Sequence, residues 1–297
     1  MIAAKSFRFF RDVLYSRPRS APGIVMRRVE EALRRAPSGV ATTRFGDVRF
    51  DVDLSMHRIT QKYYFHTHEM YLEESFHRTL RPGDIFIDIG ANIGYWSAFA
   101  LSKVGRSGEV HAFEPVPDFF RSVDGLRRLN PDFSMFANPV ACGDRPGKLP
   151  MAVVQPTPEN YNNFDTNIGS SSVLPGFLDH ERGLTESIEV DIITLDSYLA
   201  EHEIDIERIG LIKIDVEGYE SYCFDGMKTI LEKKGRKVPI LCELLTDPER
   251  HEKLDARAII QRLEGHGYRC LNATTLSPPR LEALQFEENV LFLDKNG

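Results

Sequence analysis

The sequence predicts an α/β protein in which a mainly parallel sheet carries helices on both of its faces. From residue 84 onward, short apolar segments alternate with amphipathic ones, which is the pattern of a parallel sheet connected by helices. A glycine-containing turn follows the first apolar segment directly, as in Rossmann-like nucleotide-binding domains. The chain of 297 residues is 42% hydrophobic and 27% charged, which is typical of a globular protein.

Residues 1–80 are expected to form an extension to this domain, which would itself span residues 81–297. Residues 1–36 resemble two helices, broken near Pro18 and Pro22. Residues 43–54 alternate polar and apolar side chains around a Gly-Asp pair and predict a β-hairpin. Residues 69–80 predict a helix that leads into the main domain.

The first 36 residues are locally basic, although the whole chain has a net charge of −7. A solvated helical face is the favoured interpretation, ahead of contact with an acidic partner or a membrane surface. The negative net charge argues against a nucleic-acid-binding protein. No apolar run reaches the roughly 18 residues of a membrane span. Four dispersed cysteines, without an export signal, favour a cytoplasmic protein with reduced thiols and no zinc site.

Strands and helices of the main domain can be assigned in order along the chain. Strands are expected at residues 84–89, 109–113, 134–141, 188–193, 210–216, 238–244, 268–272 and 289–293. Helices are expected at residues 93–103, 117–129, 219–233 and 254–265, with a short helix after residue 193. The last two strands are expected to form an antiparallel hairpin, and a polar insert occupies residues 154–183.

The turn DIGANIG at the end of the first strand is the predicted ligand site. In an open parallel sheet, ligands bind beyond the carboxyl ends of the strands, where backbone N–H groups of the next turn face outward. Gly90 and Gly94 let the backbone approach a ligand without a Cβ, and Asn92 tolerates left-handed conformations. Asp88 would hold the ammonium group of a bound amino acid, directly or through water. The turn, with Ala91 in its middle, therefore predicts a nucleoside ligand.

An acidic residue, Glu114, lies twenty residues after Gly94 and directly follows the second predicted strand. A carboxylate at this position usually accepts hydrogen bonds from both ribose hydroxyls. The turn reads G-x-N-x-G rather than the G-x-G-x-x-G of dinucleotide-dependent dehydrogenases, and no tyrosine is followed by the Tyr-x-x-x-Lys pattern of hydride chemistry. Both observations favour S-adenosylmethionine over NAD.

The segment LIKIDVEG places Lys213, Asp215 and Glu217 at alternating positions near the end of a predicted strand. If the strand stays extended, all three side chains point to one face, which should look into the active site. Buried charges in a parallel strand are costly unless they are paired or bind a ligand. We predict that Asp215 or Glu217 is a general base assisted by Lys213; a buried ion pair with a structural role is the alternative.

Three further groups of polar residues are weaker candidates. Asp215, Glu217 and Glu243 follow neighbouring strands and could bind magnesium or calcium, but no spacing rule demands a metal, so none is assigned. His66 and His68 could supply a base or an acceptor-binding wall, although a surface loop is the favoured interpretation. The polar insert at residues 159–167 and the serines at 170–172 are expected to line the acceptor site, with a surface excursion as the alternative.

Several sequence blocks, taken together, resemble the FkbM family of class I methyltransferases over about residues 60–293. The blocks are PGDIFIDIGANIGYWS at 82–97, HAFEPVPDFF at 111–120, NPVACGD at 138–144, GSSS at 169–172, TLDSYL at 194–199 and LIKIDVEGYE at 211–220. The last block is the most specific to the family. The resemblance implies a seven-stranded, Rossmann-like fold that binds S-adenosylmethionine.

The resemblance also implies roles for individual residues. Asp88 to Gly94 match the methionine-binding turn and Glu114 the ribose acid, while Ala141, Cys142 and Asp144 match the segment near the adenine, where Asp144 could accept from the exocyclic amine. Members of this family mainly methylate hydroxyl groups of sugars, glycans and secondary metabolites. N-methylation of a peptide or natural product and a non-catalytic nucleoside-binding protein are the alternatives; the acceptor could be a small molecule, glycan or peptide, and a homo-oligomer is left open.

Overall fold

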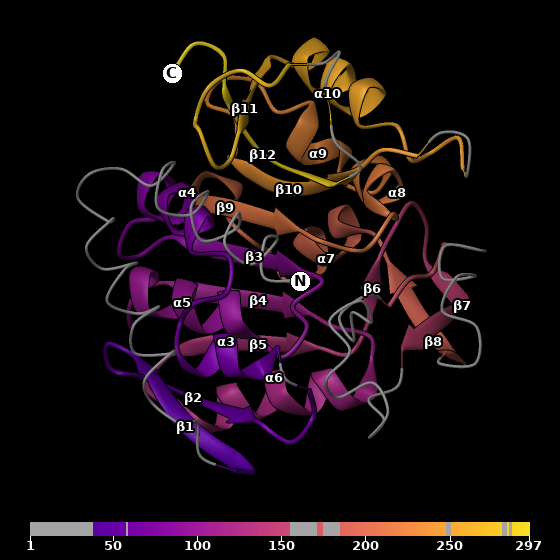
Figure 1. Ribbon diagram of the computed structural model, residues 1–297. Coiled ribbons are helices and arrows are strands. Elements are labelled where there is room, and N and C mark those ends of the chain that lie inside the picture. Colours follow the sequence, from indigo (N-terminus) through magenta and orange to yellow (C-terminus); the bar gives the residue numbers. More distant parts are fainter. Residues whose placement is uncertain are drawn as a thin grey trace.

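A seven-stranded sheet forms the centre of the protein in a computed structural model, which describes residues 38–57, 59–154, 171–174, 185–247, 251–280, 284 and 287–297. The strand order is β11-β12-β10-β9-β3-β4-β5 (Figure 1). Strand β12 is antiparallel to both of its neighbours, and the other pairs are parallel. The bounds are β3 Ile85–Ile89, β4 Glu109–Phe113, β5 Ser134–Asn138, β9 Ile209–Ile214, β10 Ile240–Leu245, β11 Tyr268–Asn272 and β12 Glu287–Asp294. The predicted α/β class and the final antiparallel hairpin are confirmed.

Helices cover both faces of this sheet (Figure 1). On one face, α4, α5 and α6 bury their apolar side chains in a cluster that also contains Phe86 of β3. On the other face, α7, α8, α9 and α10 pack over Ile87 of the same strand. Successive residues of a strand point to opposite faces, so β3 contributes to both cores and is fully buried. The helix bounds are α4 Glu73–Thr79, α5 Tyr95–Val104, α6 Pro117–Leu129, α7 Leu195–Glu201, α8 Glu220–Asp225, α9 Lys228–Leu231 and α10 Ala256–Gly265.

The described part of the N-terminal extension packs on the face that carries α5 and α6. Strands β1 (Val40–Phe45) and β2 (Val48–Asp53) form the predicted antiparallel hairpin, and Phe50 is fully buried in the core of that face. A short helix, α3 (Thr60–Tyr64), and a 3-10 turn, η1 (Met70–Leu72), connect the hairpin to α4. The two helices predicted at residues 1–36 lie outside the described residues, and the division at residue 80 stays a prediction.

A second, three-stranded sheet lies beyond the arrowheads of β4 and β5 (Figure 1). It consists of β6 (Ala141–Cys142), β7 (Gly147–Val154) and β8 (Thr185–Ile193), in the order β6-β8-β7. The strand expected at residues 134–141 is therefore wrong in its extent, because the chain leaves β5 and begins a strand of another sheet. The strand expected at 188–193 exists, but it pairs with β7 and β6 and does not join the central sheet.

Two predicted elements end earlier than expected, and close backbone packing gives the reason for one of them. The helix expected at residues 219–233 is divided into α8 and α9 at Gly226, whose position would place a Cβ 1.9 Å from the carbonyl oxygen of Gly143. Strand β9 ends at Ile214, and Glu217 adopts a left-handed backbone with φ of 52°. The expected extended strand through residue 216 is therefore wrong at its end.

Within the described residues, no helix is long and apolar enough to cross a lipid bilayer. Their four cysteines are all buried and free of disulfides.

Replacing Gly226 by alanine should destabilise the protein by about 2 to 3 kcal/mol, because the new Cβ collides with backbone and only a shift of the chain can relieve the contact. Gly125 is a matched control in the middle of α6, since a Cβ there meets nothing within 4 Å. Gly125→Ala should stabilise the protein by about 0.5 to 1 kcal/mol. Urea unfolding of both variants measures the difference, and equal effects would contradict the packing explanation.

Candidate active site

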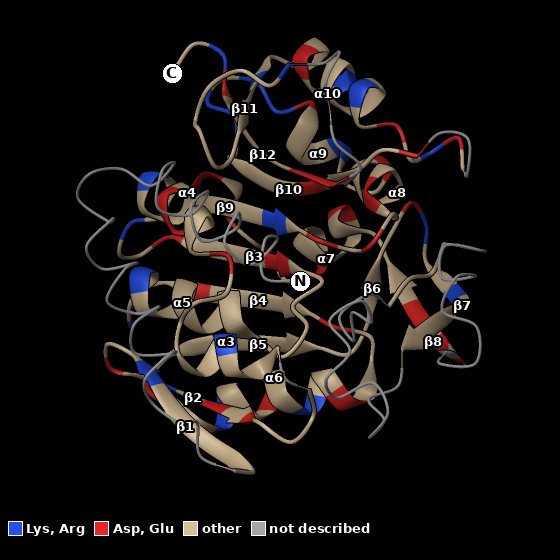
Figure 2. Cartoon of the chain, in the orientation of Figure 1, with Lys and Arg blue, Asp and Glu red and all other residues tan. Residues whose placement is uncertain are grey.

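A row of polar side chains crosses four neighbouring strands on the face covered by α5. Asn289 of β12 pairs with Glu243 of β10, and Asp88 of β3 pairs with Lys213 of β9. Each lies two residues from a side chain in the core of that face, so all four point the same way. The core neighbours are Leu291, Leu241, Phe86 and Leu211. Figure 2 shows acidic segments on β3 and β10 and a basic segment on β9.

The glycine turn after β3 packs directly on the segment after β9. A Cβ at Gly90 would lie 1.8 Å from the carbonyl oxygen of Asp215, and the residue has φ of +80°. The Asp215 N–H in turn donates to the carbonyl oxygen of Ile89 at 3.0 Å. Only glycine satisfies both the close approach and the left-handed conformation. Gly94 and Asn92 are also left-handed, with φ of 89° and 52°, as the sequence predicted for a tight turn.

Glu114 lies at the end of β4 and holds this turn from the other side. Its Oε2 accepts from the N–H of Asn92 at 2.7 Å, and its Oε1 accepts from the N–H of Val116 at 2.8 Å. Burial raises the pKa of Glu114 to about 8, against the opposing effect of these two N–H groups. Each carboxylate oxygen has a second lone pair, so the side chain can still accept from two ligand hydroxyls. The geometry therefore fits the expected role at the ribose.

Asp88 is fully buried, and only one of its carboxylate oxygens has a hydrogen-bond donor among the described residues. Ser97 Oγ donates to Oδ2 at 2.6 Å, whereas Oδ1 accepts no hydrogen bond. Burial raises the pKa of Asp88 to about 6, although the positive charge of Lys213 opposes the shift. A buried acceptor without a donor is costly, and an ammonium group or a water molecule would satisfy it. Asp88 thus fits the predicted contact with the amino-acid end of the donor.

Lys213 and Asp215 form an ion pair beside Asp88. Lys213 Nζ lies 2.8 Å from Asp215 Oδ2, and the side chain of Lys213 is 5% exposed. Burial alone would lower the pKa of Lys213, but the carboxylates of Asp215 and Asp88 outweigh it and raise the pKa. The ammonium group therefore stays charged and cannot act as a base. It can orient Asp215 and offset part of the negative charge around it.

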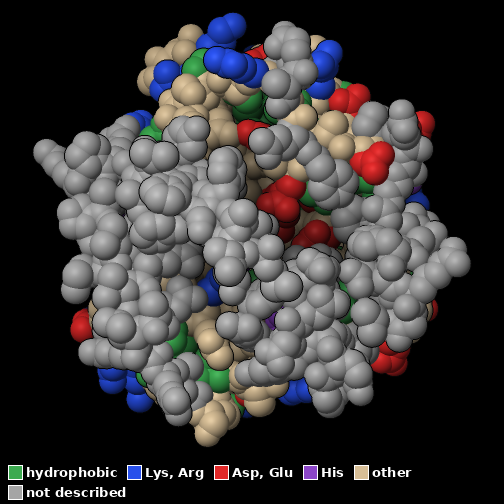
Figure 3. All heavy atoms as spheres, in the orientation of Figure 1, with side chains coloured by type: hydrophobic (Ala, Val, Ile, Leu, Met, Phe, Trp, Pro, Cys, Tyr) green, Lys and Arg blue, Asp and Glu red, His purple; other side chains and the backbone are tan. Residues whose placement is uncertain are grey.

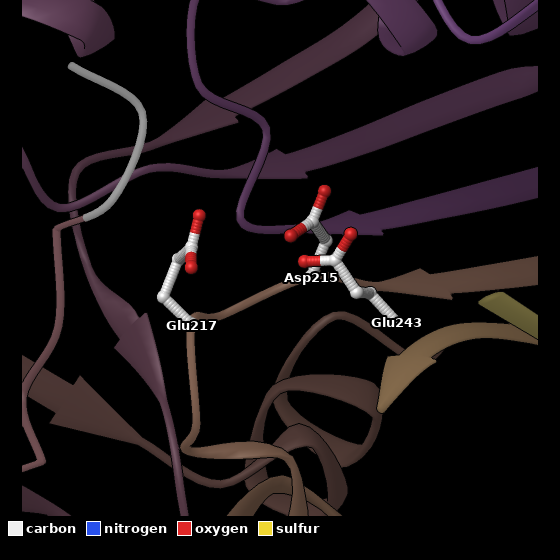
Figure 4. A group of neighbouring side chains, drawn as sticks. All are labelled: Asp215, Glu217 and Glu243. Atoms are coloured by element: carbon white, nitrogen blue, oxygen red, sulfur yellow. The ribbon is translucent and has the colours of Figure 1, made fainter. Parts of the chain in front are cut away.

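The carboxyl groups of Asp215, Glu217 and Glu243 point into one space, where one oxygen from each lies within 4.8 Å of the others (Figure 4). The left-handed turn at Glu217, and not a continued strand, brings its carboxylate to this position. Burial, followed by the charges of Asp215 and Glu217, raises the pKa of Glu243 well above its ordinary value. Three such oxygens can share a proton or bind a hard cation such as magnesium. Figure 3 shows acidic side chains in a hollow on this face.

The segment expected near the adenine lies at the start of the small sheet. Cys142 is 3% exposed and packs in the core opposite α5, and its carbonyl oxygen accepts from Cys223 Sγ at 3.2 Å. Ala141 is half-buried, and Asp144 forms an ion pair with Arg145 at 2.9 Å. The side chain of Cys142 is therefore part of the core. The carboxylate of Asp144 can still accept a hydrogen bond from an amine, so its contact with the adenine stays a prediction.

The favoured assignment of His68 to a surface loop is wrong, because its ring packs into an aromatic wall. The ring centroid of His68 lies 4.5 Å from that of Tyr63, 5.5 Å from that of Tyr95 and 6.5 Å from that of Trp96. Burial lowers the pKa of His68 to about 3, so the ring is neutral at physiological pH. His66 also packs inward, with its ring 4.2 Å from that of Phe45 and with Nε2 2.7 Å from Thr43 Oγ1.

Part of the polar insert is hydrogen-bonded to the turn after β9 that carries Asp215 and Glu217, which we call the acidic turn. Ser172 is buried, and its Oγ donates to the carbonyl oxygen of Glu217 at 2.6 Å. The backbone of Ser172 also pairs with Ala152 of β7. This hydrogen bond fixes the backbone of Glu217, whose side chain is one of the three converging carboxylates. Ser170 and residues 159–167 lie outside the described residues, so their expected place at the acceptor site stays a prediction.

Sequence reasoning missed Glu69, Tyr71 and Asn289. The hydroxyl of Tyr71 donates to Glu69 Oε1 at 3.3 Å, and Asn289 Nδ2 lies 3.5 Å from the Tyr71 oxygen and 3.4 Å from Glu243 Oε1. Asn289 could have been found by the alternation of residues in its strand, which places it on the face of the core residue Leu291. Nothing local in the sequence around Glu69 indicates contact with the carboxyl ends of distant strands.

The affinity for S-adenosylmethionine should increase as the pH rises from about 6 to about 8, by up to about tenfold per pH unit. Ribose hydroxyls donate to the carboxylate form of Glu114, whose pKa of about 8 leaves the free protein protonated at lower pH. Binding therefore requires loss of a proton below that pKa. Calorimetric titration of the protein and of Glu114→Gln measures the effect, and the variant should lose this part of the slope. The ligand amino group titrates equally in both experiments; an unchanged slope would exclude Glu114 as its origin.

Comparisons with known proteins assign this arrangement to a family. The model described as a methyltransferase FkbM domain matches residues 88–270. The 31-O-demethyl-FK506 methyltransferase FkbM of Streptomyces tacrolimicus is 30% identical over 209 residues, covering 64% of this chain and 74% of that protein. Methyltransferase 1 of Beauveria bassiana is 26% identical over 163 residues, covering 54% of this chain and 65% of that protein.

Solved methyltransferase structures are similar only at low identity. A putative rRNA-methylase from Clostridium thermocellum superposes with a TM-score of 0.39 at 11% identity, covering 75% of this chain and 95% of that one. Membership therefore rests on the sequence match, which includes the glycine turn, Glu114 and the acidic turn after β9. The chain belongs to the FkbM family of methyltransferases, and its methyl donor is S-adenosylmethionine.

Proposed function

We propose that this methyltransferase acts on a hydroxyl group of a sugar, glycan or secondary metabolite. The observation that carries the proposal is that three carboxylates lie beside the donor-binding turn, where a carboxylate oxygen can accept the proton of a hydroxyl. Gly90 contacts the backbone of Asp215, and the carboxylates of Asp215, Glu217 and Glu243 converge directly beyond it. The enzyme of Streptomyces tacrolimicus, named for methylation of 31-O-demethyl-FK506, supports a hydroxyl acceptor.

S-adenosylmethionine supplies an electrophilic methyl group, and the residues of the chain must orient the acceptor and take its proton. An alcohol is a poor nucleophile while protonated, so a base within hydrogen-bond distance of the hydroxyl accelerates the reaction. Asp215 or Glu217 would accept the proton at a carboxylate oxygen. Lys213 remains charged beside Asp215 and fixes the orientation of its second oxygen at 2.8 Å. The raised pKa of Glu243 makes this residue suited to hold a proton near both.

The proposed acceptor is a small molecule, glycan or peptide, and the net charge of −7 disfavours a nucleic acid. Methylation of an amine uses the same donor site, and the acidic cluster would attract a cationic amine. Such an amine must lose its proton before attack, which again requires a base. A panel of sugars, polyketides and peptides assayed for labelled methyl incorporation distinguishes these acceptors. The free, buried cysteines agree with the expectation of a cytoplasmic enzyme.

The variants Asp215→Asn and Glu217→Gln test the proposed base. At least one of them should reduce turnover by about 100-fold, because the hydroxyl proton loses its acceptor, while affinity for S-adenosylmethionine changes little. Asp191→Asn is a matched control on the exposed surface of β8, where the carboxylate lies 3.7 Å from Lys148. The measurement is the rate of labelled methyl transfer at saturating donor. Full turnover in both variants would remove the base assignment.

The same assay with and without a chelator tests whether the three carboxylates bind a metal ion. Loss of turnover that magnesium restores would assign Asp215, Glu217 and Glu243 to a cation, which would then weaken the hydroxyl proton itself. The position of Lys213 beside Asp215 favours the metal-independent reaction, because one cation already offsets this charge. We therefore expect turnover to persist in the chelator.

A further inference from the structure

Glu69 precedes η1 and contacts Tyr71 and His68, whose ring packs on Tyr95 at the start of α5. It lies outside the segment that the family model matches. Its side chain is 22% exposed, and its backbone is left-handed with φ of 40° and ψ of 40°. This conformation is costly for a residue with a side chain, by about 1 kcal/mol or more, so the surrounding packing must hold it. The carboxylate is therefore placed at a fixed position by the fold of the N-terminal extension.

Among the described residues, the side chains in direct contact with Glu69 are neutral. Tyr71 donates to Oε1 at 3.3 Å, and the ring nitrogen Nε2 of His68 lies 3.3 Å from Oε2. The pKa of His68 is lowered to about 3, so this contact is with a neutral ring. No lysine or arginine of the described residues forms a salt bridge with Glu69. A half-buried carboxylate among neutral groups is a favourable place for a cation.

Four other carboxylates of this face have a partner or a strongly raised pKa. Asp215 pairs with Lys213, and Asp88 accepts from Ser97. Glu114 holds the turn at the ribose side, and Glu243 is driven toward its protonated form by burial and by neighbouring charge. Glu69, by contrast, forms no ion pair with a lysine or arginine of the described residues, although the charge of Lys213 opposes the effect of burial and of Asp215 on its pKa.

Aromatic rings complete the environment around this carboxylate. Tyr95 and Trp96 begin α5 immediately after Gly94 of the donor-binding turn. Their centroids are 5.1 Å apart, and the ring of Tyr63 lies 5.3 Å from that of Tyr95. Aromatic faces attract cations, and the attraction grows when water is excluded. Burial, followed by the charge of Asp215, raises the pKa of Glu69, and a bound cation would oppose this shift.

We propose that Glu69 recognises the positively charged sulfonium of the methyl donor and so favours the donor over its demethylated product. The proposal rests on the methyl-transfer function, because it assigns the sulfonium end of the donor to the space beside α5. Methyl transfer converts the sulfonium into a neutral thioether, and the attraction to Glu69 is then lost. Glu69 would act as a specificity-determining residue that binds the donor more tightly and releases the product.

The test compares the binding of S-adenosylmethionine and S-adenosylhomocysteine by calorimetric titration. The two ligands share the adenine, ribose and amino-acid groups, so the ratio of their dissociation constants isolates the charge on sulfur. Glu69→Gln should weaken binding of S-adenosylmethionine by about 10-fold and binding of S-adenosylhomocysteine by less than about 2-fold. Glu69→Asp keeps the charge and should preserve most of the preference.

Glu74→Gln is the matched control, since Glu74 lies on the neighbouring helix α4 and forms an ion pair with Arg78 at 3.3 Å. Its binding ratio should equal that of the unmodified protein. Thermal unfolding of each variant establishes that it is folded, and the retained binding of S-adenosylhomocysteine is a second measure of an intact site. An equal loss for both ligands would overturn the proposal and place Glu69 at the ammonium group or in the fold.

Unchanged binding of both ligands by Glu69→Gln would also overturn the proposal and would show that Glu69 does not contribute to donor binding. Failure of the methyl-transfer function gives a different result, because labelled methyl incorporation would then be absent in the unmodified protein although both ligands can still bind. The titrations and the transfer assay together therefore distinguish the two failures.

Discussion

The contact between Gly90 and the carbonyl oxygen of Asp215 is the constraint on which the active site depends. A side chain at position 90 has no room, so the donor-binding turn and the acidic turn must meet through their backbones. The hydrogen bond from Asp215 to Ile89 fixes the same junction. Glu114 then fastens the turn from β4 by accepting from Asn92. The proposed donor site and the proposed base are therefore built on one rigid connection between three neighbouring strands.

The carboxylates around this junction differ in their tendency to hold a proton. Lys213 is surrounded by carboxylates and stays protonated, while burial moves Glu114 and Asp88 toward neutrality. The pKa of Glu243 is raised as well, because Asp215 and Glu217 add their repulsion to burial. Identical functional groups thus differ in protonation because their neighbours differ, which is the usual origin of acid and base roles in an active site.

The sequence was sufficient for elements whose pattern is local. The hairpin around Gly46, helix α6 and strand β11 lie where periodicity and turn residues place them. The interruption at Gly226 could not be predicted, because its cause is the carbonyl of Gly143, which is distant in the chain. The convergence of Asp215 and Glu217 was predicted for an extended strand, but a left-handed turn produces it. Glu69 was missed because its position follows from packing of the extension against α5.

The hydrogen bond from Ser172 to the backbone of Glu217 connects the small sheet to the turn after β9. Ser172 is also paired with β7 through Ala152, so this short segment is fastened at two points. The position of Glu217 therefore depends on two sheets at once, because it follows β9 of the central sheet and its carbonyl oxygen is held by a residue that pairs with the small sheet.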